Sequence, residues 1–360
     1  MYRKFSADNI FNGHEILSGN FVLITSETGV VIDIADKKDA GNDIEIYKGM
    51  LAPGFVNAHC HLELSHMKGL IPESMGLTDF ILKVVFERHF DEAIILAAIE
   101  NAENEMLQNG IVAVGDICNN ILTLPQKRKQ KLRYHNFIEA SGFPPAVADS
   151  RFQRSVDFYK SYAAAMPANS IVPHAPYSVS PQLFRLINDF HDNNIITIHN
   201  QETAAENELF KNKEGEFLEM YEKMNIDISF FESSRKSSLQ TYLPKLSQYQ
   251  SLILVHNVCT NEGDIQFQKQ QTTNNKQQTF YCLCPNANLY ISNTLPDANL
   301  FIQQNCNIVL GTDSLASNHQ LSILEEIKTL HKNFPGIFLQ TLLQWSLKCR
   351  TNHRQCGYIQ

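Results

Sequence analysis

The sequence contains no long apolar run, and this excludes one class of protein. In 360 residues no stretch approaches the roughly 18 consecutive apolar residues of a transmembrane helix. The segment MYRKFSADNIF also has no apolar signal core. We therefore expect a cytoplasmic protein without a membrane partner.

Basic residues are also few. Thirty Lys and Arg stand against 38 Asp and Glu, a net charge of -8, and QKRKQK around Lys127 is the one short basic block. We therefore expect a small-molecule substrate and not a nucleic-acid partner, and the oligomeric state stays open. The eight cysteines are scattered and read as reduced core thiols, because no secretory signal accompanies them. The close pair Cys282 and Cys284 has no second pair, so it is a weak metal signal.

Short β-branched apolar runs alternate with polar loops and longer helical patterns along most of the chain. The expected strands are 51–61, 110–118, 132–140, 170–179, 195–202, 252–258, 279–285 and 307–313. Helical stretches such as 91–109 and 180–194 lie between most of them, which implies parallel strands covered by helices. Eight such units predict an α/β fold of the (β/α)8 or TIM-barrel type.

Three segments depart from this alternation. Before residue 50 the chain has short strands and no helix, so we expect a small antiparallel sheet there, which forms a flanking β-domain at 1–50 beside a barrel at 51–345. Residues 203–250 are too long for a simple crossover and are expected to carry extra helices near the site. The polar stretch 268–278 is expected to be a mobile surface loop.

Histidines stand at the carboxyl ends of several expected strands, which meet at one mouth of a (β/α)8 barrel. His59 and His61 are two residues apart, so on a strand both side chains point to the same face. Two such imidazoles can hold one divalent ion, although two polar barrel residues bonded to the backbone are the alternative. His199 and Asp313, at the ends of the fifth and eighth strands, can complete the set. The ligands leave an open position for water, as in a catalytic site.

Two further residues suit proton transfer in the same place. Glu202 lies three residues after His199 and can take a proton from the water and deliver it to a substrate nitrogen. The alternative is a first-turn helix residue favoured by the helix dipole, which we expect of Glu206. His256 ends the sixth strand and can polarise the water or the leaving group, or be a satisfied polar barrel residue.

Two other residues are candidates for contact with the substrate. His174, in PHAPYSVS, is expected to contact substrate and not metal, because the metal ligands are already supplied. Glu63 can also reach a substrate, and a packing or salt-bridge role is equally compatible with its position. The remaining histidines are expected to be surface or structural residues.

The motifs PGFVNAHCHLELS, PHAPYSVS, HNQETAAE, VHN, CPNANLYI and GTDSLASN occur in the order found in the amidohydrolase superfamily. The chain most resembles its branch of cytosine, guanine and adenosine-type deaminases and triazine chlorohydrolases. The motif HCHLELSHMKG is similar to that of aminodeoxyfutalosine deaminase relatives. The resemblance covers roughly residues 1–345.

The resemblance implies roles for the matching residues. His59, His61, His199 and Asp313 would bind one divalent metal, zinc in preference to iron. Glu202, His256 and Asp313 would be catalytic, and His174 would meet the substrate. The implied reaction is hydrolytic deamination of an aminated purine- or pyrimidine-type ring or nucleoside with release of ammonia.

Other activities remain open for the same residues. A chlorohydrolase or a cyclic amide hydrolase would use the same site, and a metal-binding homologue without activity would keep it. Family members usually return to the β-domain after the last barrel helix, whereas residues 346–360 form an atypical polar tail here. We therefore expect a β-domain without its C-terminal half, with an open sheet edge.

Overall fold

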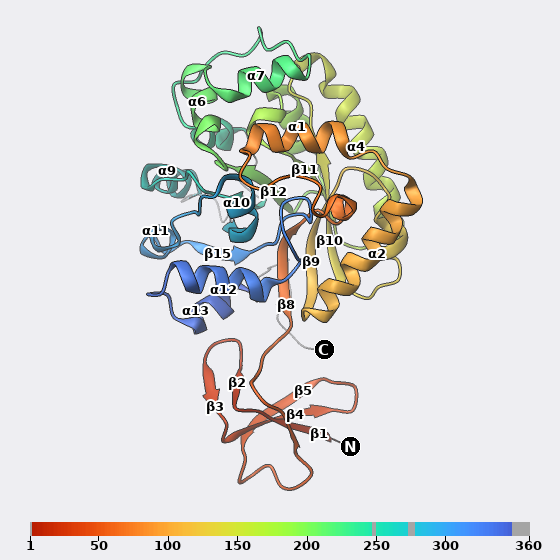
Figure 1. Ribbon diagram of the computed structural model, residues 1–360, viewed down its shortest axis with the longest axis vertical. Coiled ribbons are helices and arrows are strands. Elements are labelled where there is room, and N and C mark those ends of the chain that lie inside the picture. The colour runs from red at the N-terminus through yellow and green to blue at the C-terminus, as the bar shows by residue number, and fades with distance from the viewer. Residues whose placement is uncertain (1, 247–249, 273–277, 348–360) are drawn as a thin grey trace.

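The structure is a computed structural model that describes residues 2–246, 250–272 and 278–347 (Figure 1). The expectation for the tail at 346–360 falls almost entirely outside these residues. Within them, no helix has the length and apolar character that crossing a bilayer requires.

Two four-stranded parallel sheets make up the centre of the molecule. In spatial order they are β11-β10-β9-β8 and β12-β13-β14-β15. The strands are β8 (Phe55–Cys60), β9 (Ile111–Cys118), β10 (Arg133–Ala140), β11 (Asn169–Pro173), β12 (Ile195–Asn200), β13 (Ser251–His256), β14 (Thr279–Leu283) and β15 (Asn307–Leu310). All eight expected strands are present, and β12 and β14 are buried along their whole length, as strands covered on both faces must be.

The two sheets meet at both of their outer strands. Between β11 and β12, the His199 amide donates to the His174 carbonyl at 2.9 Å. Between β15 and β8, the Asp313 amide donates to the His59 carbonyl at 3.1 Å. These bonds lie at the carboxyl ends of the strands, so they bring the ends of β8, β11, β12 and β15 to one place. The arrangement has the parallel strands and intervening helices expected of the barrel.

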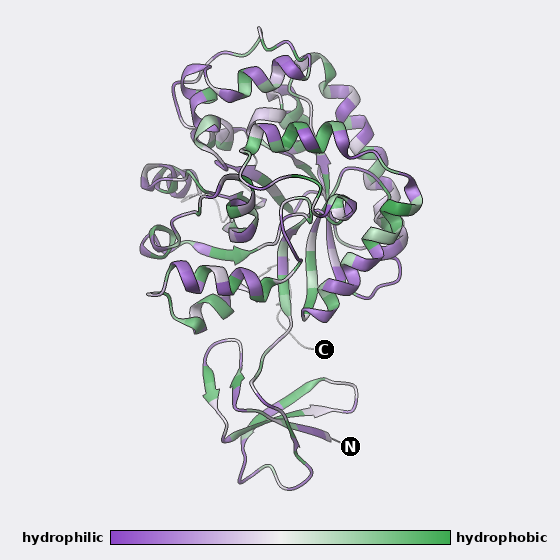
Figure 2. Ribbon diagram, viewed as in Figure 1, coloured by the Kyte–Doolittle hydropathy of each residue, from purple (hydrophilic) through white to green (hydrophobic). Residues whose placement is uncertain are grey.

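Helices separate most of the parallel strands and carry alternating polar and apolar stretches (Figure 2). They are α1 (Leu77–Glu87), α2 (Glu92–Gln108), α3 (Leu124–Lys127), α4 (Ala148–Ala163), α5 (Pro181–Asn188), α6 (Ala204–Asn212), α7 (Glu216–Lys223), α8 (Ser238–Tyr242), α9 (Glu262–Thr272), α10 (Pro285–Ser292), α11 (Ala298–Gln303), α12 (Ile323–Asn333) and α13 (Leu339–Trp345). The 3₁₀ helices are η1 (Leu62–Met67), η2 (Pro145–Val147), η3 (Pro176–Ser178) and η4 (Leu243–Lys245).

The long segment 203–250 carries the expected extra helices, namely α6, α7, α8 and η4. The expectation of a loop from residue 268 is wrong for its first part, because α9 continues to Thr272. Gln and Lys are good helix formers, and buried Gln268 donates to the Thr279 hydroxyl at 2.7 Å, which ties the helix to β14.

The N-terminal strands lie at one end of the molecule, away from α1, α6 and α7 (Figure 1). They are β1 (Tyr2–Ser6), β2 (Asn9–Phe11), β3 (Ile16–Ser18), β4 (Phe21–Ser26), β5 (Val31–Asp36), β6 (Glu45–Ile46) and β7 (Met50–Leu51). They form two small sheets, β5-β4-β1-β6 and β3-β2-β7, where the sequence suggested one antiparallel sheet. Neither sheet is purely antiparallel, because β6 pairs parallel with β1 and β7 pairs parallel with β2.

Candidate metal centre and active site

Three imidazoles and one carboxylate converge at the carboxyl ends of β8, β12 and β15. His59 and His61 alternate with Cys60, so both rings point to the centre while the thiol packs in the core. His199 comes from β12, and Asp313 follows β15 with a φ of 56°, a strained value of the kind that concentrates at functional sites. Gly311 permits this approach, since a Cβ there would lie 2.9 Å from the His59 Cβ.

The distances within this group fit a divalent ion. His61 Nε2 lies 3.2 Å from His59 Nε2 and 3.3 Å from His199 Nε2, and Asp313 Oδ1 lies 3.5 Å from the Nε2 atoms of both His59 and His61. Nitrogen ligands about 2.0–2.1 Å from a tetrahedral ion stand about 3.3 Å apart, which matches these separations. All four side chains are buried.

Protonation states also suit a metal. His199 Nδ1 lies 2.8 Å from the His174 carbonyl, which can only accept, so the Nε2 of the neutral ring carries the lone pair. Burial lowers the pKa of His61 and of His199 well below the ordinary value, which keeps both rings neutral. Burial works to raise the pKa of Asp313, but the neighbouring His59, His61 and His256 rings hold it well below its usual range.

His256 is a fifth group in reach of the centre. Its ligand atom lies within 4.8 Å of those of His59, His199 and Asp313. The Asn288 amide nitrogen is 3.0 Å from His256 Nδ1, so with this amide orientation Nδ1 accepts and Nε2 carries the proton. Nε2 in turn lies 3.6 Å from Glu202 Oε2. His256 therefore presents an N–H group and not a lone pair, which distinguishes it from His199.

Glu202 lies between the histidine cluster and helix α6. Burial, followed by the negative charges of Asp313 and Glu206, raises its pKa well above the ordinary value. Glu206 is buried in the first turn of α6, as expected, and its carboxylate accepts from the Gln201 and Glu202 amides at 3.0 and 3.4 Å. These bonds fix the backbone at Glu202 and position its side chain beside the histidine cluster.

The other predicted substrate contacts differ in their surroundings. His174 lines the cavity and its pKa is lowered to about 4, chiefly by burial. Glu63 does not line it: its carboxylate accepts from the Asn119 amide at 2.8 Å and from Asn119 Nδ2 at 2.6 Å, and Arg88 is 3.9 Å away. Direct substrate contact by Glu63 stays a prediction, and the salt-bridge alternative accounts for the contacts observed.

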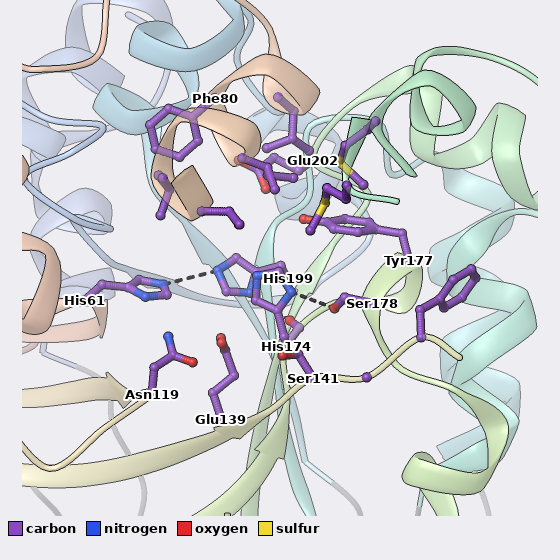
Figure 3. A pocket seen from close by; sticks show the side chains of 18 of the residues that line it. His61, Phe80, Asn119, Glu139, Ser141, His174, Tyr177, Ser178, His199 and Glu202 are labelled. Atoms are coloured by element: carbon purple, nitrogen blue, oxygen red, sulfur yellow. Dashed lines mark hydrogen bonds between the residues drawn. The ribbon is translucent and has the colours of Figure 1, made fainter. Parts of the chain in front are cut away.

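A cavity of about 450 Å³ opens over these groups (Figure 3). Its inner end is lined by His61, His199, Glu202, His256 and Asp313. Apolar side chains of α1 and of the α7 region form an outer wall that includes Leu77, Phe80, Ile81, Val84, Met220, Met224 and Ile226. Arg88, Asn119, Glu139 and His174 form a polar strip. The volume is in the range of sites for small organic molecules.

The sequence interpretation missed Glu139, Asn119 and Arg88. Glu139 lies one residue before the end of β10. The criterion that selected the histidines, a position at the carboxyl end of an expected strand, would therefore also have selected Glu139. Asn119 follows β9 in the same way. Arg88 ends α1 and had no comparable sequence signal.

Comparisons with known proteins agree with this architecture. A family model described as the amidohydrolase family matches residues 50–335. The aminodeoxyfutalosine deaminase of Nitratiruptor sp. is 25% identical over 288 residues, which cover 78% of this chain and 67% of that protein. The 5-methylthioadenosine/S-adenosylhomocysteine deaminase of Bacillus cytotoxicus is 22% identical over 363 residues, covering 93% of this chain and 76% of that protein.

Solved structures share the fold. The crystal structure of Helicobacter pylori aminofutalosine deaminase in complex with methylthio-coformycin has a TM-score of 0.80 at 22% identity, covering 96% of this chain and 85% of that one. An adenosine deaminase from Xanthomonas campestris with bound zinc has a TM-score of 0.69 at 18% identity, covering 96% and 78%. Because the family model spans most of its length, the chain belongs to the amidohydrolase family.

Proposed function

We propose that the chain is a hydrolytic deaminase that removes the exocyclic amine of an aminopurine nucleoside and releases ammonia. The observation that carries this proposal is the position of Glu202, a buried carboxyl group with a raised pKa whose Oε2 lies 3.6 Å from His256 Nε2, beside the His59, His61, His199 and Asp313 cluster. Such a pairing suits a ring nitrogen that must gain a proton, because a departing halide needs none.

The relatives support the purine nucleoside over other amines. Several of the similar proteins are named as deaminases of adenosine, 5'-deoxyadenosine, methylthioadenosine or aminodeoxyfutalosine. The outer wall of Phe80, Ile81, Val84 and Met220 supports a substrate with an apolar group far from its amine. The barrel at 51–345 would supply this site, with the β-domain at 1–50 outside it.

His59, His61, His199 and Asp313 would hold one divalent metal. We expect zinc in preference to iron, because imidazole and carboxylate are common zinc ligands and a fold neighbour was solved with zinc bound. The ion, when bound, would supply a water acidic enough to act as a nucleophile near neutral pH.

The remaining steps belong to the protein's own side chains. Asp313 is ionised and can accept a proton from the attacking water, and His256 can orient that water through its Nε2–H. Glu202 donates its proton to the ring nitrogen as the carbon becomes tetrahedral. The amine leaves as ammonia with the proton that Asp313 took from the water, and the hydroxyl proton of the tetrahedral adduct returns to Glu202. The net reaction replaces the amine with a carbonyl oxygen, consumes one water and releases one ammonia.

The test is ammonia release by metal-loaded enzyme. The panel is adenosine, 5'-deoxyadenosine, methylthioadenosine, guanine and cytosine, with a chlorinated triazine assayed for chloride and a cyclic amide assayed for ring opening. We expect ammonia from at least one adenine nucleoside. Chloride release or amide opening without deamination would replace the proposal with one of its alternatives. No turnover by fully loaded protein would favour an inactive metal-binding homologue.

A further inference from the structure

Two hydrogen-bond acceptors face the cavity beside the histidine cluster. Glu139, in β10, is 9% exposed, and its Oε2 is enclosed by protein without a hydrogen-bond partner. His174 follows β11, and both side chains line the cavity, close to the His199 ring (Figure 3). Ligand atoms of Glu139, His174 and His199 lie within 4.8 Å of one another. Glu139 and His174 are therefore close enough to bind the same part of a substrate.

The hydrogen bonds of His174 show which of its nitrogens is the acceptor. The Ser178 hydroxyl donates to the Ala175 carbonyl at 3.1 Å, so its oxygen accepts from His174 Nδ1 at 2.6 Å. The proton of the neutral ring is therefore on Nδ1, and Nε2 offers a lone pair. Glu139 and His174 thus present two hydrogen-bond acceptors to the cavity. A substrate that binds both of them must supply two hydrogen-bond donors.

A second metal ion does not account for this pair as well. The third member of the group, His199, uses Nδ1 to donate to the His174 carbonyl at 2.8 Å. Its Nε2 faces His61 Nε2 at 3.3 Å, in the first cluster. A second ion would be left with Glu139 and His174 alone. Without an ion, the two acceptors are satisfied when a substrate donates hydrogen bonds to them.

The position of the pair in the cavity indicates which part of a nucleoside would reach it. Glu202 follows β12 and His256 ends β13, so a ring nitrogen protonated by Glu202 puts the base on that side. Glu139 and His174 stand on β10 and after β11, on the other side of His199. The sugar is the part of a nucleoside that extends away from the reacting carbon and carries paired hydroxyl groups.

We propose that Glu139 and His174 accept hydrogen bonds from the vicinal hydroxyl groups of the substrate's ribose, and that Glu139 thereby makes the enzyme specific for ribonucleosides. The inference rests on the proposed function. Carboxylates recognise ribose hydroxyls in the same manner in dinucleotide-binding folds. A site built to bind a hydroxyl discriminates strongly against a substrate that lacks it, because the buried acceptor is then left unpaired.

The experiment compares substrates that differ by one hydroxyl group. We measure kcat/KM of the metal-loaded enzyme for the best adenine ribonucleoside of the panel and for its 2'-deoxy and 3'-deoxy analogues, with wild type and Glu139→Gln. Wild type should lose at least about 100-fold with one of the analogues. Glu139→Gln should lose activity mainly on the ribonucleoside, so that the ratio falls to within about 5-fold.

Controls separate specificity from damage. Glu219→Gln alters an exposed carboxylate on α7 that does not line the cavity, and it should keep both the rate and the ratio. The metal content of Glu139→Gln should equal that of wild type, and its loss would make Glu139 a ligand and overturn the inference. The wild-type comparison itself needs no variant, so the test stands even if Glu139→Gln fails to fold.

Two outcomes distinguish the inference from the function beneath it. Equal rates on ribo- and both deoxynucleosides by wild type would overturn ribose recognition and leave the deaminase proposal intact. Unchanged discrimination in Glu139→Gln would do the same. Absence of ammonia from every nucleoside with fully loaded wild type would overturn the proposed function, and the inference with it.

Discussion

Among the individual residues, Glu202 combines burial with a position at the edge of the cavity. It is 4% exposed with a raised pKa, yet it borders an open cavity and the imidazole of His256. A structural glutamate would be expected to pair with donors, as Glu206 does with two backbone amides. The Glu202 carboxyl group instead lies 3.6 Å from His256 Nε2 and lines the cavity.

We expect Glu202→Gln to abolish turnover and to leave the metal content intact. Glutamine has nearly the same size and hydrogen-bonding ability but cannot transfer a proton, and general acid–base catalysis contributes about 10²–10⁴-fold. Steady-state rates with elemental analysis of the same sample provide the measurement. A loss of less than about fivefold would remove Glu202 from the mechanism, and a loss of metal would recast it as a ligand.

We expect about one equivalent of divalent metal per chain, lost in Asp313→Ala. Asp313 supplies the carboxylate of the cluster that it forms with His59, His61 and His199. The control is Asp297→Asn, which removes an exposed carboxylate at the N-cap of α11, outside the cavity, and keeps a hydrogen-bond acceptor for the helix. Less than about 0.2 equivalents in wild type, with no uptake from added zinc or iron, would contradict the site.

At the level of secondary-structure elements, a buried ion pair on β9 supports the chain beside the histidine cluster. Asp116 Oδ1 accepts from the Leu62 amide at 2.8 Å, directly after His61, and Oδ2 lies 2.5 Å from Lys127 Nζ. Lys127 is fully buried between the Tyr134 and Tyr162 rings and also donates to Asn136 at 2.8 Å. The pair therefore ties α3, β9 and the loop after β8 together.

Lys127→Met should destabilise the protein by about 3–5 kcal/mol, because it leaves the Asp116 carboxylate buried without its cation. Lys129→Met is the matched control, since its ion pair with Glu100 is exposed and should contribute at most about 1 kcal/mol. Urea unfolding of metal-free protein measures both. Equal midpoints for the two variants would mean that the buried pair adds nothing to stability.

His135 of β10 provides a prediction about acid stability. Burial lowers its pKa from the ordinary 6.5 to about 4, and its Nε2 bonds the Ser170 hydroxyl at 3.0 Å. A group whose pKa is lower in the folded state stabilises it above pH 6.5, and this contribution is lost as the pH falls from 6.5 towards 4. His135→Gln should therefore cost stability at pH 7 and less at pH 4.5. The measurement is the free energy of unfolding of wild type and variant by chemical denaturation at pH 7 and pH 4.5. The same difference between the two proteins at both pH values would contradict the prediction.

The sequence predicted the strands and the histidine cluster because both depend on local patterns. Alternation of apolar runs with helices defines parallel strands, and His59 and His61 share a face by spacing alone. The cavity wall did not follow, because apolar periodicity in α1 and α7 gives each helix a buried face but not the partner of that face. Lys127 belongs to the short basic block, so nothing in the sequence indicated that it is buried. Its burial depends on the ion pair with Asp116, which is a tertiary contact.

For the molecule as a whole, the two small N-terminal sheets expose several large apolar side chains. Ile46 is 74% exposed, Tyr2 66% and Ile32 53%. β5 and β6 are the outer strands of their sheet among the described residues. Exposed apolar side chains on outer strands favour association between molecules.

We therefore expect the double variant Ile32→Lys with Ile46→Lys to self-associate less than wild type. Lysine on outer strands opposes edge-to-edge pairing, and both side chains already lie in solvent, so the change should cost little stability. The matched control is Ile95→Lys, which buries a charge in α2 and should lower the melting temperature instead. Sedimentation at several concentrations, with Tm and metal content for each protein, makes the comparison. If wild type and double variant have the same mass distribution and solubility, these sheets are closed by other means and the expectation of an open edge is wrong.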